Sequence, residues 1–121
     1  QEQMAKTVYV AIIIDDMGVD VLRSNKVMAL ENKNLTLSFL PYANEITKQI
    51  ATAKQKGFDI MMHLPMQPEN DEIQLPQDCL KVGDTRSVIA TKLEHNLANF
   101  PNVKATNNHM GSLFTENYPE L

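Results

Sequence analysis

The stretch Val8–Gly18, which reads VYVAIIIDDMG, decides the fold class of this chain of 121 residues. Its apolar, largely β-branched side chains follow one another with almost no polar alternation, which is typical of a strand buried on both faces of a parallel sheet. The run predicts a strand over about residues 7–14. Two adjacent carboxylates, Asp15 and Asp16, end it, and Gly18 lets the chain turn away without a clash at Cβ.

The position of the two acids predicts a function. In parallel α/β sheets, ligands bind just beyond the carboxyl ends of the strands, and we expect Asp15 and Asp16 to lie at that edge. The alternative is that Asp16 only caps the following helix, which is a common role for a single aspartate. Two acids directly after a buried strand favour the functional interpretation.

Strands and helices alternate along the rest of the chain. The apolar pattern predicts further strands at about Leu35–Leu40, Phe58–Leu64 and Val103–Asn107, and helices that begin after Asp20, Asn44 and either Asp84 or Thr85. Elements at this spacing form right-handed βαβ units. The predicted fold class is therefore α/β, a parallel-stranded βα repeat.

Composition excludes several classes of protein. The net charge of −4, from 11 basic and 15 acidic residues without a basic run, argues against nucleic acid as a partner. No apolar stretch approaches the roughly 20 residues needed to span a bilayer. Cys79 stands alone, so no intrachain disulfide is possible. The chain starts at Gln1 rather than Met, and we expect a processed or trimmed chain.

Each predicted strand ends in chemically active side chains, which a parallel sheet would bring to one edge. They are Asp15 and Asp16, then Tyr42, then His63, then Asn107, Asn108 and His109. A carboxylate and two imidazoles can hold a divalent metal and leave a position open for water, which suits zinc and also non-haem iron. The alternative for each histidine is a hydrogen-bonded structural role. The remaining histidine, His95, is predicted to face solvent without a role.

With IIIDDMG, LSFLPYA, MMHLPMQP and NNHMGS in this order, the chain resembles the divergent polysaccharide deacetylase family, a bacterial cell-envelope branch related to the NodB-type carbohydrate esterases. The resemblance covers nearly the whole chain. It implies that Asp15 is the catalytic base and that Asp16, His63 and His109 bind the metal, with zinc as the expected ion. The superfamily usually supplies both histidines as H-x-x-x-H. Here Gln67 stands four residues after His63, so the second imidazole would come from His109.

The resemblance also implies a distorted NodB-like (β/α) barrel, of which this chain supplies about four βα units. We therefore expect a single, truncated domain over residues 1–121 that forms the N-terminal part, about half, of the barrel. An unclosed half-barrel exposes a sheet edge, which self-association could cover. The location implied by the resemblance is periplasmic, or otherwise extracytoplasmic, in a bacterium.

The function implied by the resemblance is metal-dependent hydrolysis of N-acetyl groups on a cell-envelope glycan. Tyr42 would stack on a sugar ring or serve only in packing, and Asn107 and Asn108 would orient His109 or donate to the substrate. The strands that carry the superfamily's general acid are absent, which favours an alternative: a catalytically inactive glycan-binding or scaffolding protein that retains the metal pocket. A phospho-receiver domain is a distant third, because it needs an aspartate where His63 stands.

Overall fold

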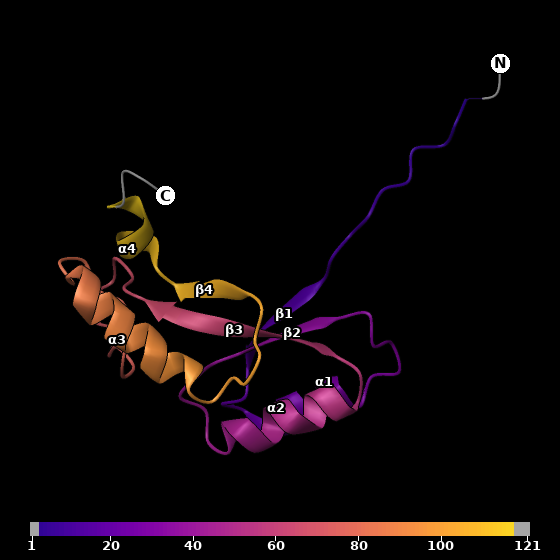
Figure 1. Cartoon of the computed structure of the whole chain (residues 1–121), viewed down its shortest axis with the longest axis horizontal. Helices are drawn as coiled ribbons and strands as arrows, with labels where there is room; N and C mark the ends of the chain where they lie inside the picture. Colours follow the sequence, from indigo (N-terminus) through magenta and orange to yellow (C-terminus); the bar gives the residue numbers. More distant parts are fainter. Residues whose placement is uncertain (1–2, 118–121) are drawn as a thin grey trace.

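The structure, a computed structural model, describes residues 3–117. Its strands form one sheet: β1 (Ile13–Met17), β2 (Thr36–Phe39), β3 (Asp59–Met66) and β4 (Thr106–Met110). They lie in the order β1-β2-β3-β4, and every neighbouring pair is parallel (Figure 1). The predicted parallel βα repeat is confirmed, and the sheet with its helices forms part of a (β/α) barrel.

Helices alternate with these strands along the chain: α1 (Val21–Met28), α2 (Ile46–Gln55), α3 (Arg86–Leu97) and α4 (Ser112–Glu116). Two of them begin at predicted caps. The Asp20 carboxylate accepts a hydrogen bond from the Arg23 backbone N–H at 3.0 Å, and the Thr85 hydroxyl accepts one from the Val88 N–H at 3.3 Å. Figure 1 shows α1, α2 and α3 on the same side of the sheet. No helix within residues 3–117 is long and apolar enough to cross a membrane.

The predicted cap of α2, Asn44, is wrong. The residue at the N-cap is Glu45, which has a left-handed φ of 52° and makes no side-chain hydrogen bond to the helix. Instead, the buried side chain of Gln49 donates to the carbonyls of Gly18 and Asn44 at 2.9 and 3.0 Å. This amide ties the start of α2 to the turn after β1, a tertiary contact that the local sequence does not reveal.

The hydrophobic core lies between the two central strands and α2. Leu37 and Phe39 of β2 and Met62 of β3 are buried, and Ile50 and Ala53 of α2 pack against them. Because β2 and β3 each have a strand on both sides, their apolar runs are enclosed as expected for a parallel sheet. This core is the rigid support for the side chains at the carboxyl ends of the strands.

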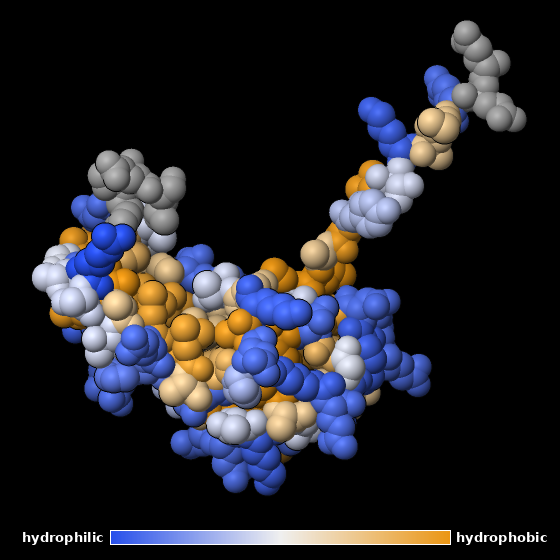
Figure 2. All heavy atoms as spheres, viewed as in Figure 1, coloured by the Kyte–Doolittle hydropathy of each residue, from blue (hydrophilic) through white to orange (hydrophobic). Residues whose placement is uncertain are grey.

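The first strand differs most from the prediction. β1 begins at Ile13, well after the predicted start, and residues 3–12 extend away from the sheet (Figure 1). Val8 is 79% exposed, and Figure 2 shows apolar side chains uncovered along this arm. Thr36 N–H donates to the Ile12 carbonyl at 3.0 Å, and within the described residues β1 is an edge strand. The expected burial on both faces is therefore wrong, because residues 3–11 have no neighbouring strand in the part of the chain that the structure describes.

The fourth strand pairs further along the chain than predicted. Thr106–Met110 pairs with residues 62–66, which places His109 opposite Pro65, inside the strand rather than beyond it. Between α3 and β4 the chain makes a turn in which Asn102 has a left-handed φ of 61°. Residues 103–105, which the sequence predicts as the start of the strand, lie between this turn and β4 and are not part of the strand.

Candidate metal centre

Asp15 and Asp16 lie in a bulge of β1 rather than beyond its end. Ile14 pairs with Leu37 but Met17 pairs with Phe39, so three steps along β1 match two along β2. Asp16 itself has a left-handed φ of 56°. A bulge bends the strand and changes the direction of its side chains. The extra residue at this point allows the two neighbouring carboxylates to reach different partners.

Asp16, His63 and His109 meet at the carboxyl end of the sheet. Asp16 Oδ1 lies 3.2 Å from His63 Nε2 and 3.0 Å from His109 Nδ1. One ligand atom from each of the three residues lies within 4.8 Å of the others. The residues come from β1, β3 and β4, so the parallel order of the strands brings together side chains that are far apart in sequence.

The cluster has a buried wall and an open side. The His63 side chain is 4% exposed, whereas the Asp16 side chain is 67% exposed. The two imidazole rings meet edge to face, with centroids 4.9 Å apart and an interplanar angle of 60°. The histidines therefore form a fixed wall, and solvent or a substrate can approach from the side of the carboxylate.

Burial lowers the pKa of His109 below its ordinary value, and the neighbouring His63 adds to this effect, although the charge of Asp16 opposes it. A lowered pKa means that the His109 imidazole is neutral at neutral pH. The neutral ring is the form that binds a metal, because its unprotonated nitrogen carries the lone pair.

Asp15 lies beside the cluster. Its Oδ1 is 3.9 Å from His63 Nδ1 and accepts a hydrogen bond from the Asn107 amide at 2.7 Å. The side chain is 47% exposed. A carboxylate that is both anchored and accessible can accept a proton from a molecule bound at the cluster.

The other predicted residues fall in different places. The half-exposed Tyr42 borders a cavity of about 330 Å³ with Asp78 and Asn99. Burial and then the charge of Asp16 raise the pKa of its phenol, so it stays protonated at neutral pH. Asn108 is turned to the Met110 carbonyl at 2.7 Å. His95 is exposed, as predicted, and its Nδ1 lies 3.2 Å from Asp78.

Asn107 bonds to Asp15 and His63 rather than to His109. It also accepts a hydrogen bond from Ser38 at 2.5 Å, a residue that the sequence did not single out. Ser38 is fully buried in β2. A lone serine inside the apolar run LTLSFL is the signal that could have found it, because a buried hydroxyl needs a partner.

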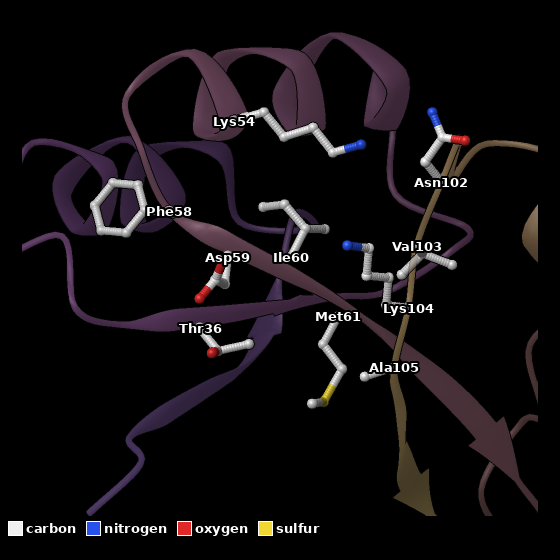
Figure 3. A pocket seen from close by; sticks show the side chains of 10 residues that line it. All are labelled: Thr36, Lys54, Phe58, Asp59, Ile60, Met61, Asn102, Val103, Lys104 and Ala105. Carbon is white, nitrogen blue, oxygen red and sulfur yellow. The ribbon is translucent and has the colours of Figure 1, made fainter.

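A second cavity, of about 380 Å³, lies at the opposite end of the sheet. Asp59 and Ile60 at the start of β3 line it with residues 102–105, which precede β4 (Figure 3). Lys54 of α2 and Lys104 also border it. None of the strand-end acids or histidines lines this cavity. The chemically active side chains thus gather at the carboxyl end of the sheet, where parallel α/β proteins place their sites.

Two of the three ligand separations in the cluster match the spacing around a divalent metal. Ligand atoms at about 2.1 Å from a tetrahedral zinc ion lie about 3.4 Å from one another. The separations from Asp16 Oδ1 to His63 Nε2 and His109 Nδ1, 3.2 and 3.0 Å, are close to this spacing. One carboxylate and two imidazoles are also a donor set that transition metals prefer.

The comparisons with known proteins identify the class of this chain. It matches the model of the divergent polysaccharide deacetylase family over residues 12–121 and belongs to that family. It is 29% identical to the uncharacterized protein YibQ of Escherichia coli over 107 residues, which are 88% of this chain and 33% of YibQ. An uncharacterized protein of Haemophilus influenzae is 27% identical over 111 residues, which are 92% of this chain and 39% of that protein.

The fold has a relative among solved structures. The crystal structure of the uncharacterized protein ATU2773 from Agrobacterium tumefaciens is similar with a TM-score of 0.83 and 23% identity, over 94% of this chain and 47% of that one. The chain therefore spans about a third to two-fifths of the curated relatives and about half of the solved chain. The resemblance drawn from the motifs is confirmed at the level of the family.

Proposed function

We propose that this chain carries the metal site of a metal-dependent hydrolase that removes N-acetyl groups from a cell-envelope glycan. The observation that supports this most directly is the convergence of Asp16, His63 and His109 beside the accessible carboxylate of Asp15. Membership of the divergent polysaccharide deacetylase family is consistent with a role in carbohydrate metabolism.

Asp16 Oδ, His63 Nε2 and His109 Nδ1 would hold the metal, and zinc suits this donor set best. When bound, such a metal polarises a carbonyl oxygen and lowers the pKa of a water molecule. The buried His63 and the partly buried His109 supply two of the ligand atoms, and the exposed Asp16 leaves the approach open. A rigid set of ligands with one open side is the arrangement that a catalytic site requires.

Asp15 would act as the base. It lies next to His63 but takes no part in the three-residue cluster, so its carboxylate is free to accept the proton of the attacking water. The protonated phenol of Tyr42 would contact the sugar, because it is half-exposed and close enough to Asp16 to feel its charge. Asn108 is exposed near the same edge and would donate to substrate hydroxyls only after leaving the Met110 carbonyl.

The proposal extends to the location and the partners of the protein. With a cell-envelope glycan as its substrate, the protein would act outside the cytoplasm, in the periplasm of a bacterium. The free edge of β1 and the apolar arm before it favour association with a second copy.

The test is release of acetate from chitin oligosaccharides and from N-acetylated peptidoglycan fragments. We expect the zinc-loaded chain to release acetate, and chelation or Asp15→Asn to abolish the release. Zinc binding and glycan binding without any release would instead support the alternative, an inactive glycan-binding or scaffolding protein that retains the metal pocket. Absence of both zinc binding and acetate release would contradict the proposal.

A further inference from the structure

The side chain of Asn107 joins three groups that belong to different strands. Its Nδ2 donates to Asp15 Oδ1 at 2.7 Å. Its Oδ1 lies 2.5 Å from Ser38 Oγ, which donates to it, and 2.8 Å from His63 Nδ1. Asn107 therefore stands between the proposed base and a proposed metal ligand.

The strand register explains why these side chains meet. Asn107 pairs with His63, and Ser38 pairs with Met61, two residues before His63. Because side chains alternate between the faces of a sheet, Ser38, His63 and Asn107 all lie on one face. The neighbouring Asn108 lies on the other face, which makes it a natural control.

The chemistry of Asp15 determines the orientation of the Asn107 amide. A carboxylate only accepts hydrogen bonds, so the amide NH₂ must face Asp15 and the amide oxygen must face Ser38 and His63. An amide oxygen only accepts, so His63 Nδ1 must carry a proton. In the neutral ring, Nε2 then keeps its lone pair, and this is the atom that faces Asp16 at 3.2 Å.

We propose that Asn107 is a positioning residue, which fixes His63 in the tautomer that presents Nε2 to a metal and holds Asp15 beside it. That a metal binds to Nε2 rests on the proposed function, whereas the tautomer of His63 does not. Ser38 is fully buried and holds the Asn107 oxygen in place. Partners of this kind beyond the ligands are known to orient metal-binding histidines.

Removal of the amide should reverse the tautomer. In Asn107→Ala, His63 Nδ1 loses its acceptor, and Asp15 Oδ1 at 3.9 Å is beyond hydrogen-bond distance, whereas Nε2–H can donate to Asp16 Oδ1 at 3.2 Å. The proton on Nε2 then blocks the ligand nitrogen. We expect zinc affinity to fall about 10- to 100-fold, the usual effect of removing such a partner.

Asn107→Asp separates the two parts of the role. A carboxylate still accepts from His63 Nδ1 and from Ser38, so the tautomer and zinc binding should be retained. It cannot donate to Asp15 and adds a like charge beside it, so acetate release should be lost. Retained zinc with lost turnover is a result that a merely structural role for Asn107 would not produce.

The decisive experiment is long-range ¹H–¹⁵N NMR of the histidine rings in the metal-free chain. We expect a proton on His63 Nδ1 in the wild type, in Asn107→Asp and in the control Asn108→Ala, and the Nε2–H tautomer, with no proton on Nδ1, in Asn107→Ala. Should Asn107→Ala not fold, Ser38→Ala offers a second variant, in which the Nδ1–H tautomer should be less populated. Zinc affinity follows by competition calorimetry on the same proteins.

Two outcomes would overturn the inference. One is an Nε2–H tautomer of His63 in the wild type. The other is a His63 tautomer that does not differ between the wild type and Asn107→Ala. The predicted change of tautomer in a chain that neither binds zinc nor releases acetate would support the positioning of His63 while refuting the proposed function. The failures of the two proposals are thus distinguishable.

Discussion

Asp16 combines a proposed ligand with an unfavourable backbone conformation. Its φ of 56° lies in the left-handed region, which costs L residues other than glycine about 1–2 kcal/mol, although aspartate tolerates it better than most. The surrounding bulge of β1 and its pairing with β2 hold the residue there. Strain of this kind gathers at functional sites because it positions side chains.

The strain at Asp16 predicts an order of stability between two variants. Asp16→Gly and Asp16→Ala both remove the carboxylate, but only glycine adopts the left-handed conformation freely. We expect Asp16→Gly to be more stable than Asp16→Ala by up to about 1 kcal/mol, measured by urea unfolding. Equal stability, or a more stable alanine variant, would mean that position 16 is not held in this conformation.

The two adjacent acids should respond differently to loss of charge. Asp16→Asn removes one of the three ligand atoms of the cluster, so zinc binding should be lost. Asp15→Asn lies outside that set and should retain zinc while losing acetate release. Calorimetry and an acetate assay on both variants distinguish the roles. Loss of zinc in Asp15→Asn with retention in Asp16→Asn would show that the roles are exchanged.

The elements show how far local sequence could predict the fold. Buried apolar runs predicted β2 and β3 well, because both strands have neighbours on either side. The same kind of run made the predicted first strand too long, because the arm before β1 is apolar but exposed. The fourth strand starts at Thr106 rather than at the predicted Val103, because its pairing with β3 begins only there, and strand pairing leaves no mark in the local pattern.

The helix caps provide a test at the scale of elements. Asp20→Ala removes the hydrogen bond to the Arg23 N–H and should destabilise the protein by about 1 kcal/mol. Asn44→Ala is the matched control, because the exposed Asn44 side chain does not cap the helix. Its free energy of unfolding should differ from that of the wild type by no more than about 0.5 kcal/mol. Urea unfolding measures both. A larger decrease in stability for Asn44→Ala than for Asp20→Ala would contradict this and would support Asn44 as the cap of α2.

The tertiary structure, rather than the local sequence, determines the hydrogen bonds that orient the side chains of the site. The convergence of Asp16, His63 and His109 followed from the parallel order of strand ends, although their role as ligands stays a prediction. The link between Asn107 and Asp15 spans 92 positions in the sequence. It depends on the bulge in β1 and on the register in which β4 pairs with β3, which are tertiary features. Local patterns therefore predicted the members of the cluster but not the hydrogen bonds that orient them.

The exposed arm and the edge of β1 predict self-association of this chain. Val8, Tyr9 and Val10 are exposed apolar side chains beside a strand that has no outer neighbour among residues 3–117. We expect sedimentation velocity to show dimers whose fraction grows with concentration. The double variant Val8→Lys with Val10→Lys should remain monomeric. A wild-type chain that stays monomeric throughout the micromolar range would contradict this prediction.

The metal content of the purified chain tests the central claim most directly. After purification without chelator or nickel affinity, elemental analysis should find about one zinc or iron ion per wild-type chain. The ion should be lost in His109→Ala and retained in His95→Ala, a control histidine that lies outside the cluster beside Asp78. Absence of metal in the wild type, or equal metal in wild type and His109→Ala, would contradict the assignment of Asp16, His63 and His109 as a metal centre.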